Sequence, residues 1–205
     1  MCSLQRSRGP EAAVTAGEKA ISRRKRYTVG LVLAIVFLDQ LTKLLARLYL
    51  QPRGSLRVVA NYLRFTYVEN PGMAFGIEIP NKILFNVLSF AAVLVIFYYL
   101  FKMKEHTLLR ISFASILGGA FGNLTDRVLH GRVVDFIDVK FFDLRFNGAN
   151  FLFFHLPSFG FDRWPVFNLA DMAVTVGMFT VILSTFLPLS SETPAAYATE
   201  QDSHL

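Results

Sequence analysis

Charged residues and cysteines are both scarce in this chain. Only 18% of its 205 residues are Asp, Glu, Lys or Arg, whereas 53% are hydrophobic. That balance excludes an ordinary water-soluble domain and indicates an α-helical integral membrane protein. The single cysteine, Cys2, excludes an internal disulfide framework and any metal site built from several cysteines.

The motifs of several hydrolase classes are also missing. The chain contains no HExxH, CxxC, GxSxG or phosphate-binding P-loop sequence. Its histidines form no pattern of metal ligands: His106, His130, His155 and His204. We therefore expect no metal, no cofactor, and no serine or cysteine nucleophile.

Four apolar runs are long enough to cross a bilayer, which takes about 20 helical residues. The expected transmembrane helices cover residues 27–49, 82–101, 107–129 and 166–188. The first run is too long for the apolar part of a signal peptide, and no small-residue cleavage site follows it. We therefore expect this helix to be retained.

Basic residues flank these runs unevenly. Seven lysines and arginines lie within residues 1–26, and Lys102, Lys104 and Arg110 lie between the second and third spans. Basic residues near span ends favour the cytoplasmic side of a membrane. The alternative is an arm that binds nucleic acid. We favour a role in orienting the protein in the membrane, because that role requires no further binding partner.

This orientation divides the chain into three parts. We predict a basic cytoplasmic tail at 1–26, a four-span membrane domain at 27–189 and a polar cytoplasmic tail at 190–205. Both termini are then cytoplasmic, and residues 50–81 and 130–165 form loops on the outer face.

Parts of the outer loops have the character of half-exposed strands. Apolar and polar residues roughly alternate over 55–68 and again over 132–142, which predicts a small sheet on the outer membrane surface. Residues 141–161 instead hold eight phenylalanines among Asn, Gly, His and Pro. Two interpretations stay open for this segment: a loop lying in the membrane interface, or a packed extracellular subdomain.

Two aspartates near the outer ends of the third and fourth spans are candidates for chemistry. Asp135 lies in an apolar, strand-like frame, and Asp171 shares a helix face with Asn168, about two turns inside its span. Ionisable groups are costly at such depth, and two converging acids suggest a shared proton. The alternative for Asp171 is a helix-start acid favoured by the helix dipole. The residues alone do not select Asp135 over Asp126 or Asp138.

The first span carries Asp39 and Lys43 one helical turn apart, with Arg47 a turn further. They form either an intrahelical ion pair, with Lys43 and Arg47 extending outward to the interface, or a proton relay or headgroup clamp. We favour a structural or binding role, because an ammonium neighbour makes a carboxyl group unsuited to acid catalysis.

The third span combines small and polar residues. The GxxxG spacing of Gly118 and Gly122 predicts close packing by another helix. Asn123 and Arg127 follow one turn apart, and an aspartate beside a guanidinium, as Asp126 is, braces a loop more often than it performs catalysis.

Five segments resemble, in content and in order, the motifs of lipoprotein signal peptidase, the bacterial signal peptidase II family. They are DQLTK (39–43), ENPGMAFGI (69–77), GGAFGNLTDR (118–127), GRVVDFIDV (131–139) and FNLADMAVT (167–175). The resemblance implies an aspartic endopeptidase of the bacterial cytoplasmic membrane that cleaves prolipoproteins immediately before a diacylglyceryl-modified cysteine. It also implies lipidated prolipoproteins and membrane lipid as partners, with no nucleic acid and no obligate protein partner.

The same resemblance assigns residues to the site. It implies Asp135 and Asp171 as the catalytic pair, near the outer face. Supporting or substrate-binding roles go to Asn70, Asn123, Asp126, Arg127, Asn168, Asp39 and Lys43. The two acids lie 36 residues apart, farther than is usual in the family, so we interpret 141–163 as an insertion. The long basic N-terminal arm is also atypical.

Two other classes of function compete with this interpretation. A proton-coupled transporter would use Asp39, Asp126 and Asp171 as a path, but such proteins have inverted repeats, and none is visible here. A non-enzymatic scaffold would use the glycine face, but it leaves the outer polar cluster unexplained.

Overall fold

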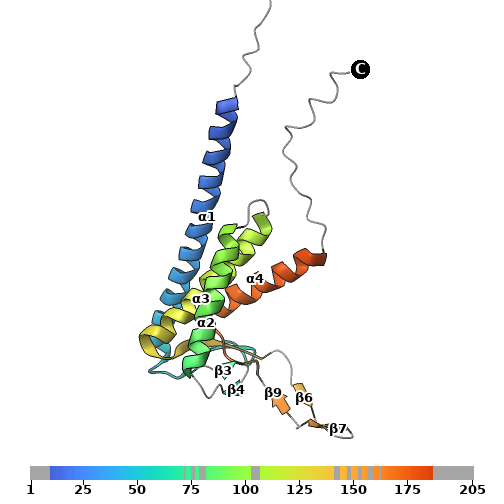
Figure 1. The fold of residues 1–205 in the computed structure, drawn as a ribbon. Coiled ribbons are helices and arrows are strands. Elements are labelled where there is room, and N and C mark those ends of the chain that lie inside the picture. The colour runs from blue at the N-terminus through green and yellow to red at the C-terminus, as the bar shows by residue number, and fades with distance from the viewer. Residues whose placement is uncertain are drawn as a thin grey trace, which may run out of the picture.

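The computed structural model describes most of the helices and the strands between them. The described residues are 10–71, 73–74, 77–78, 82–102, 107–140, 144–146, 149–151, 154–156, 159–161 and 163–186. Within 10–20, 73–78, 82, 85 and 144–161, the structure describes the backbone of these residues but not their side chains. Helices form one part of the molecule, and the strands gather at one end of them (Figure 1).

Each of the four expected spans contains a helix. The helices are α1 (Pro10–Leu45), which continues into the short π-helix η1 (Ala46–Leu50), α2 (Lys82–Lys102), α3 (Thr107–His130) and α4 (Leu169–Phe186). Among the described residues, Ile21–Leu50, Thr107–His130 and Leu169–Phe186 are long and apolar enough to cross a membrane. α2 has 21 residues, which rise about 31 Å, and it is apolar over Asn86–Lys102.

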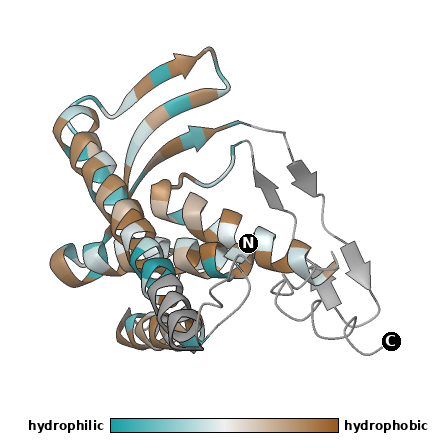
Figure 2. Ribbon diagram, turned by 90° about the horizontal axis from the view of Figure 1, so that it is seen from above, coloured by the Kyte–Doolittle hydropathy of each residue, from teal (hydrophilic) through white to brown (hydrophobic). Residues whose placement is uncertain are grey.

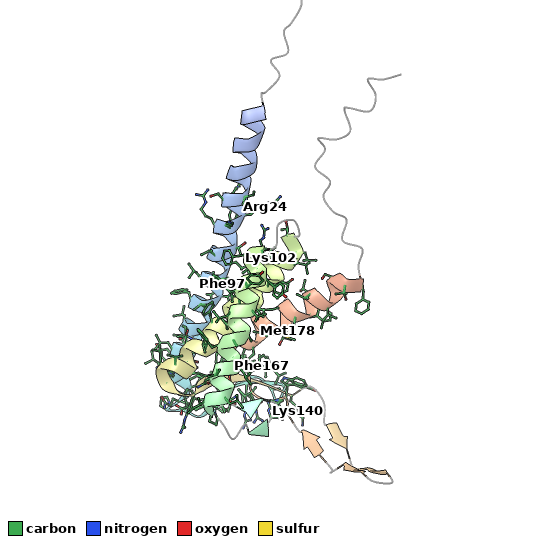
Figure 3. All side chains as sticks on the ribbon, in the orientation of Figure 1. Arg24, Phe97, Lys102, Lys140, Phe167 and Met178 are labelled. Carbon is green, nitrogen blue, oxygen red and sulfur yellow. The ribbon has the colours of Figure 1, made fainter. Side chains whose placement is uncertain are left out.

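The first helix begins earlier than predicted. It starts at Pro10, so the described part of the basic segment is a helical extension of the span. Arg24 of this extension lies at the same end of the molecule as Lys102, away from Phe167 and Lys140 (Figure 3). The two basic clusters therefore share one end, as the predicted orientation requires. Which side of the membrane this end faces stays a prediction.

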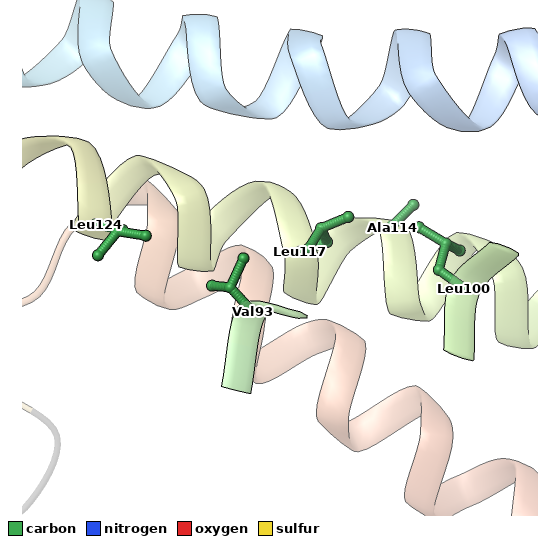
Figure 4. Packing of buried hydrophobic residues seen from close by; sticks show 5 residues of the cluster. All are labelled: Val93, Leu100, Ala114, Leu117 and Leu124. Carbon is green, nitrogen blue, oxygen red and sulfur yellow. The ribbon is translucent and has the colours of Figure 1, made fainter. Parts of the chain in front are cut away.

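α3 is the central helix, because it packs against α1, α2 and α4. Its Ala114, Leu117 and Leu124 form a buried cluster with Val93 and Leu100 of α2 (Figure 4). Many large apolar side chains of the helices are exposed, and hydrophobic residues recur along the helices in Figure 2. Such surfaces are stable against lipid rather than water.

Glycines let α3 approach its neighbours closely, which confirms the packing predicted from the GxxxG spacing. A Cβ on Gly118 would meet Ile35 of α1, and a Cβ on Gly119 would meet the Ala170 carbonyl oxygen of α4. A Cβ on Gly122 would meet the carboxylate of Asp39. The glycines therefore allow both α1 and α4 to pack closely against α3, and they bring the Asp39 carboxylate of α1 against α3.

The predicted strands form a three-stranded antiparallel sheet. β1 (Ser55–Val59), β2 (Leu63–Asn70) and β5 (Val133–Val139) lie in the order β1-β2-β5. A second cluster, in which Val134 and Phe136 of β5 pack with Ala46 and Leu50 of η1, joins the sheet to the end of the first helix. A separate pair, β3 (Met73–Ala74) and β4 (Ile77–Glu78), follows β2.

The phenylalanine-rich segment contains strands where the sequence predicted a loop or a subdomain. β6 (Leu144–Phe146) pairs with β9 (Phe159–Phe161), and β7 (Ala149–Phe151) pairs with β8 (Phe154–Leu156). Leu144 pairs with Phe161 and Ala149 with Leu156, so both pairs are nested about the same point of the chain. The two pairs thus share the register of one hairpin. The position of the aromatic rings lies outside the described side chains.

The fourth helix begins later than predicted. Phe167 is held in an extended conformation by two hydrogen bonds with Ile137 of β5: its N–H donates to the Ile137 carbonyl (3.1 Å), and its carbonyl accepts from the Ile137 N–H (2.7 Å). α4 therefore starts at Leu169, and Asp171 lies in its first turn. The predicted start at 166, with Asp171 two turns inside, is wrong.

Candidate active site

Two carboxylates from different elements meet at one buried amide. Asp135 projects from β5 and is 3% exposed, whereas Asp171 lies in the first turn of α4. Asn168, which is fully buried, donates from its side-chain amide to Asp135 Oδ1 (2.7 Å) and from its backbone N–H to Asp171 Oδ2 (3.1 Å). One residue therefore holds both acids.

Asn168 and Asp171 also form the N-terminal cap of α4. The Asn168 Oδ1 accepts a hydrogen bond from the Asp171 N–H at 3.0 Å, while the Asp171 carboxylate accepts from the Asn168 N–H. This reciprocal arrangement satisfies two backbone donors that a helix start otherwise leaves unpaired. The helix-start interpretation of Asp171 is therefore correct, and the cap also fixes the direction of its carboxylate.

A chain of polar contacts connects the two acids to α1. Asn123 of α3 donates to Asp171 Oδ1 (2.7 Å) and accepts from Lys43 Nζ (2.8 Å). Lys43 in turn pairs with Asp39 at 2.8 Å, and Asp39 accepts a hydrogen bond from the Ala170 N–H of α4 (3.0 Å). The predicted Asp39–Lys43 ion pair is confirmed. Lys43 does not extend outward, because it is 1% exposed.

Asp126 braces the site through partners that the sequence did not indicate. It pairs with Lys43 (3.1 Å) and Arg47 (3.4 Å) and accepts a hydrogen bond from the Val134 N–H (3.3 Å). These contacts tie α3 to the first helix and to β5. A bracing role was expected for Asp126, but as a neighbour of Arg127 rather than between α1 and the sheet.

Asp138, the other aspartate of β5, forms an ion pair with a residue that is distant in the sequence. It pairs with Arg163 and accepts a hydrogen bond from the Thr66 hydroxyl (3.0 Å). Within the described part of the chain, no ion pair includes Asp135 or Asp171. The sequence alone did not select Asp135 over Asp126 or Asp138. Their surroundings in the fold distinguish them, because Asp126 and Asp138 form ion pairs, whereas Asp135 accepts hydrogen bonds from amides.

The remaining predicted residues lie around the pair. Asn70, at the end of β2, donates to Asp135 Oδ2 at 3.1 Å. Arg127 of α3 is half-buried and interacts electrostatically with Asp171, Asp135 and Asp126. All nine predicted site residues therefore belong to one connected region, while their individual roles stay predictions.

Burial and charge together make Asp135 a weak acid. Removal from water, and then the nearby charge of Asp171, raise the pKa of its carboxyl from 3.8 to about 7. The hydrogen bonds from Asn70 and Asn168 oppose this rise. Asp135 is therefore suited to carry a proton near neutral pH.

Two residues of this region were missed by the sequence reasoning. Gln40 donates to Asp39 (3.2 Å) and to the Gly122 carbonyl (3.1 Å), and its only signal was its place within DQLTK. Arg163 gave no signal, because it meets Asp138 only in the folded chain. Among the described residues, no group of three or more His, Cys, Asp or Glu side chains is arranged to hold a metal ion.

Comparisons with known proteins identify the family of this chain. The family described as signal peptidase (SPase) II matches residues 31–187. A lipoprotein signal peptidase from Moorella thermoacetica is 36% identical over 164 residues, covering 79% of this chain and 94% of the relative. A second, from Caldanaerobacter subterraneus, is 48% identical over 122 residues, covering 60% of this chain and 84% of the relative.

Solved structures support the fold. A bacterial membrane enzyme determined at 2.3 Å resolution superposes with a TM-score of 0.62 and 27% identity. The superposition covers 78% of this chain and 87% of that one. With the matched segment spanning every motif from Asp39 to Asp171, the chain belongs to the lipoprotein signal peptidase family, the bacterial membrane proteases known as signal peptidase II.

Proposed function

We propose that this protein is an aspartic endopeptidase that removes signal peptides from prolipoproteins, cutting immediately before a diacylglyceryl-modified cysteine. Membership of the signal peptidase family supports the substrate class. The observation that carries the aspartic mechanism is a pair of acids, Asp135 and Asp171, joined by Asn168. Among the described residues these two form no ion pair, whereas the neighbouring aspartates do.

The two acids have different surroundings, and these suit one to act as a general acid and the other as a general base. Asp135 is buried on a strand, with its pKa raised to about 7, so it carries the proton. Asp171 lies in the first turn of a helix, where negative charge is favoured, and both of its oxygens accept hydrogen bonds from N–H groups. It is also the more accessible of the two.

Peptide hydrolysis then proceeds in two balanced steps. Asp171 takes a proton from a water molecule as the water oxygen bonds to the scissile carbonyl carbon, and Asp135 gives its proton to the carbonyl oxygen. In the second step Asp171 returns its proton to the nitrogen as the carbon–nitrogen bond breaks, and Asp135 recovers its own. The acids end as they began, and no cofactor takes part.

The position of the site suits a substrate that is itself anchored in a membrane. The acids lie where α3 ends and α4 begins, beside the sheet rather than midway along the spans. In the proposed orientation this level is the outer face of the cytoplasmic membrane, with both termini on the cytoplasmic side. The diacylglyceryl group would then lie in the outer leaflet and the signal helix alongside the spans.

A transporter interpretation has less support, because its three acids do not form a path across the membrane. Asp39 and Asp126 both pair with Lys43, and Asp171 contacts the same lysine's partner, Asn123. All three acids therefore belong to one local network. A path would require them at successive depths.

The decisive experiment is cleavage of a synthetic signal peptide carrying a lipidated cysteine. Asp135→Asn and Asp171→Asn should each lower the rate by about 10²–10⁴-fold, the usual worth of a general acid or base, with membrane insertion unchanged. The matched control is Asp138→Asn, the same substitution at the other acid of β5, which pairs with Arg163 and should remain active.

The product identifies the bond that is cut. Sequencing of the released fragment should place the cut amino-terminal to the lipidated cysteine. Full activity of either dyad variant would contradict the aspartic mechanism, and cleavage of an unlipidated peptide at an equal rate would contradict the substrate class.

A further inference from the structure

A second polar site lies on the opposite face of β5 from the two acids. It is a pocket of about 150 Å³ whose lining includes Arg47, His130, Arg132, Tyr67 and Glu69. Val134 also lines it, and because successive strand residues face opposite sides, Asp135 points away from it. The pocket therefore excludes the two acids, although Arg47 of its lining also pairs with Asp126.

The pocket carries both signs of charge. Arg132 pairs with Glu69 at 3.1 Å, and the Tyr67 hydroxyl donates to the same carboxylate at 2.9 Å. Arg47 approaches His130 to 2.7 Å on the other side. The lining thus offers guanidinium groups to an anion, and a carboxylate with a phenol oxygen to an ammonium group.

The pocket is also accessible to a ligand. The side chains of Arg132, His130 and Glu69 are 58%, 44% and 39% exposed, so their polar ends reach solvent although they are paired. Its volume is well below the roughly 300–1,000 Å³ of sites for drug-sized ligands, and it suits a small polar group.

The surroundings indicate where such a group would come from. Arg47 lies in η1 and His130 is the last residue of α3, so both lie at the ends of membrane-length helices. Next to these residues are side chains that are large, apolar and exposed: Leu48, Tyr49, Val128 and Leu129. A polar pocket bordered by lipid-facing side chains is placed at the level of lipid headgroups.

We propose that this pocket binds the headgroup of a phospholipid of the phosphoethanolamine class. The phosphate lies against Arg47, Arg132 and His130, and the primary ammonium group lies against Glu69 and the Tyr67 oxygen. An ammonium with three N–H donors is preferred to a trimethylated one, which has no donor for these oxygens. The acyl chains extend along the apolar surface beside η1 and the end of α3.

The test measures lipid binding to the full-length protein in detergent by native mass spectrometry. Short-chain phosphatidylethanolamine is compared with phosphatidylcholine, phosphatidylglycerol and inorganic phosphate. Arg132→Gln and Glu69→Gln should each weaken phosphatidylethanolamine binding about tenfold, the effect of losing one charged contact. Arg57→Gln is the matched control, because Arg57 is exposed on the same sheet but does not line the pocket.

The outcomes separate the possible ligands. The proposal expects about tenfold preference for phosphatidylethanolamine over the other two lipids. Glu69→Gln should remove this preference, Arg132→Gln should weaken the binding of all three lipids because all carry the phosphate, and the control should change neither. Equal binding of all lipids in every variant would identify non-specific annular lipid and overturn the proposal. Phosphate binding as tight as the lipid, and weakened by Arg132→Gln, would identify a free-anion site and overturn it as well. Thermal unfolding of both variants, compared with Arg57→Gln, shows that each is folded.

Discussion

At the scale of single residues, the site depends on which acids form ion pairs and which accept hydrogen bonds from amides. Asp126 and Asp138 have arginine or lysine partners, whereas Asp135 has two amide donors. The different neighbours of Asp126, Asp135 and Asp138 in the fold therefore give them different chemical properties. Local sequence does not carry that information, because Arg163 lies 25 residues beyond Asp138.

The pH dependence of cleavage should report Asp135. Because the pKa of its carboxyl is raised to about 7, the proposed acid loses its proton as the pH rises through that value. We expect kcat/KM to fall about tenfold per pH unit above about pH 7. A rate that stays constant up to about pH 9, measured with the same lipidated peptide, would contradict the assignment of Asp135 as the proton donor.

Stability should follow the same group with a definite sign. A carboxyl whose pKa is raised on folding binds its proton more tightly in the folded state, so its contribution to stability is greatest below pH 3.8 and declines until about pH 7. Asp135→Asn removes this dependence. Between about pH 4 and about pH 7, the melting temperature of the parent in detergent should therefore fall relative to that of the variant.

Asn168 allows its capping and linking roles to be tested separately. Asn168→Ala removes the cap of α4 and should cost about 1 kcal/mol, in addition to leaving buried partners unsatisfied. Asn168→Asp keeps a good capping residue but adds a third carboxylate beside Asp135.

The two variants should diverge in one measurement and agree in another. We expect Asn168→Asp to retain more thermal stability than Asn168→Ala, while both lose at least about 100-fold in cleavage rate. Wild-type cleavage by Asn168→Asp would show that the amide is not needed to link the two acids.

At the scale of secondary-structure elements, α3 acts as the surface on which the other helices are positioned. Its glycines admit α1 on one side and α4 on the other, and this close approach lets Asp39 of α1 reach the Ala170 N–H of α4. The packing of the helices therefore determines the geometry of the site.

Substitutions of these glycines should show that link. Gly119→Ala would press a methyl group on the Ala170 carbonyl, near the start of α4, and overpacking of this kind costs about 1–3 kcal/mol. Gly30→Ala is the matched control, since nothing lies within 4 Å of the added carbon. We expect Gly119→Ala to lower both the melting temperature and the cleavage rate, with Gly30→Ala neutral or slightly stabilising. Equal behaviour of the two would argue against close helix packing.

The elements were predictable to different degrees. Long apolar runs and alternating residues were sufficient for the spans and for β1, β2 and β5, because burial against lipid or against a core requires those periods. The start of α4 was not predictable, since it is set by the pairing of Phe167 with Ile137, 30 residues earlier. The strands β6 to β9 were missed because each one alternates over only three residues, which is too short a run to predict a strand.

The nine residues chosen from a family resemblance lie together in the fold, and their roles stay predictions. Their geometry was not predictable, because the burial of Lys43 and the contacts of Asp126 depend on helices that are distant in the sequence. The distinction between Asp135 and Asp138 likewise required the fold.

At the scale of the whole molecule, the orientation in the membrane decides which substrates reach the acids. The basic end holds Arg24 and Lys102, and the sheet lies at the other end (Figure 3). Positive charge near the span ends predicts that the basic end is cytoplasmic.

Labelling of single cysteines tests this orientation directly. With Cys2 replaced by serine, Arg57→Cys on β1 and Arg23→Cys on α1 each supply one exposed thiol. A membrane-impermeant maleimide should label Arg57→Cys in intact spheroplasts, and Arg23→Cys only after the membrane is opened. The reverse pattern would place the acids on the cytoplasmic side and exclude a substrate anchored in the outer leaflet.

The pairing between β5 and the approach to α4 has a consequence for the timing of activity during synthesis. Asp135 can be in its strand before α4 is made, but Asp171 and Asn168 arrive only with the fourth helix, whose start must reach both Asp39 and Ile137. A nascent chain that has inserted three helices therefore holds one acid and no linking amide. Under the proposed mechanism, the protein is therefore inactive until its fourth helix has been inserted.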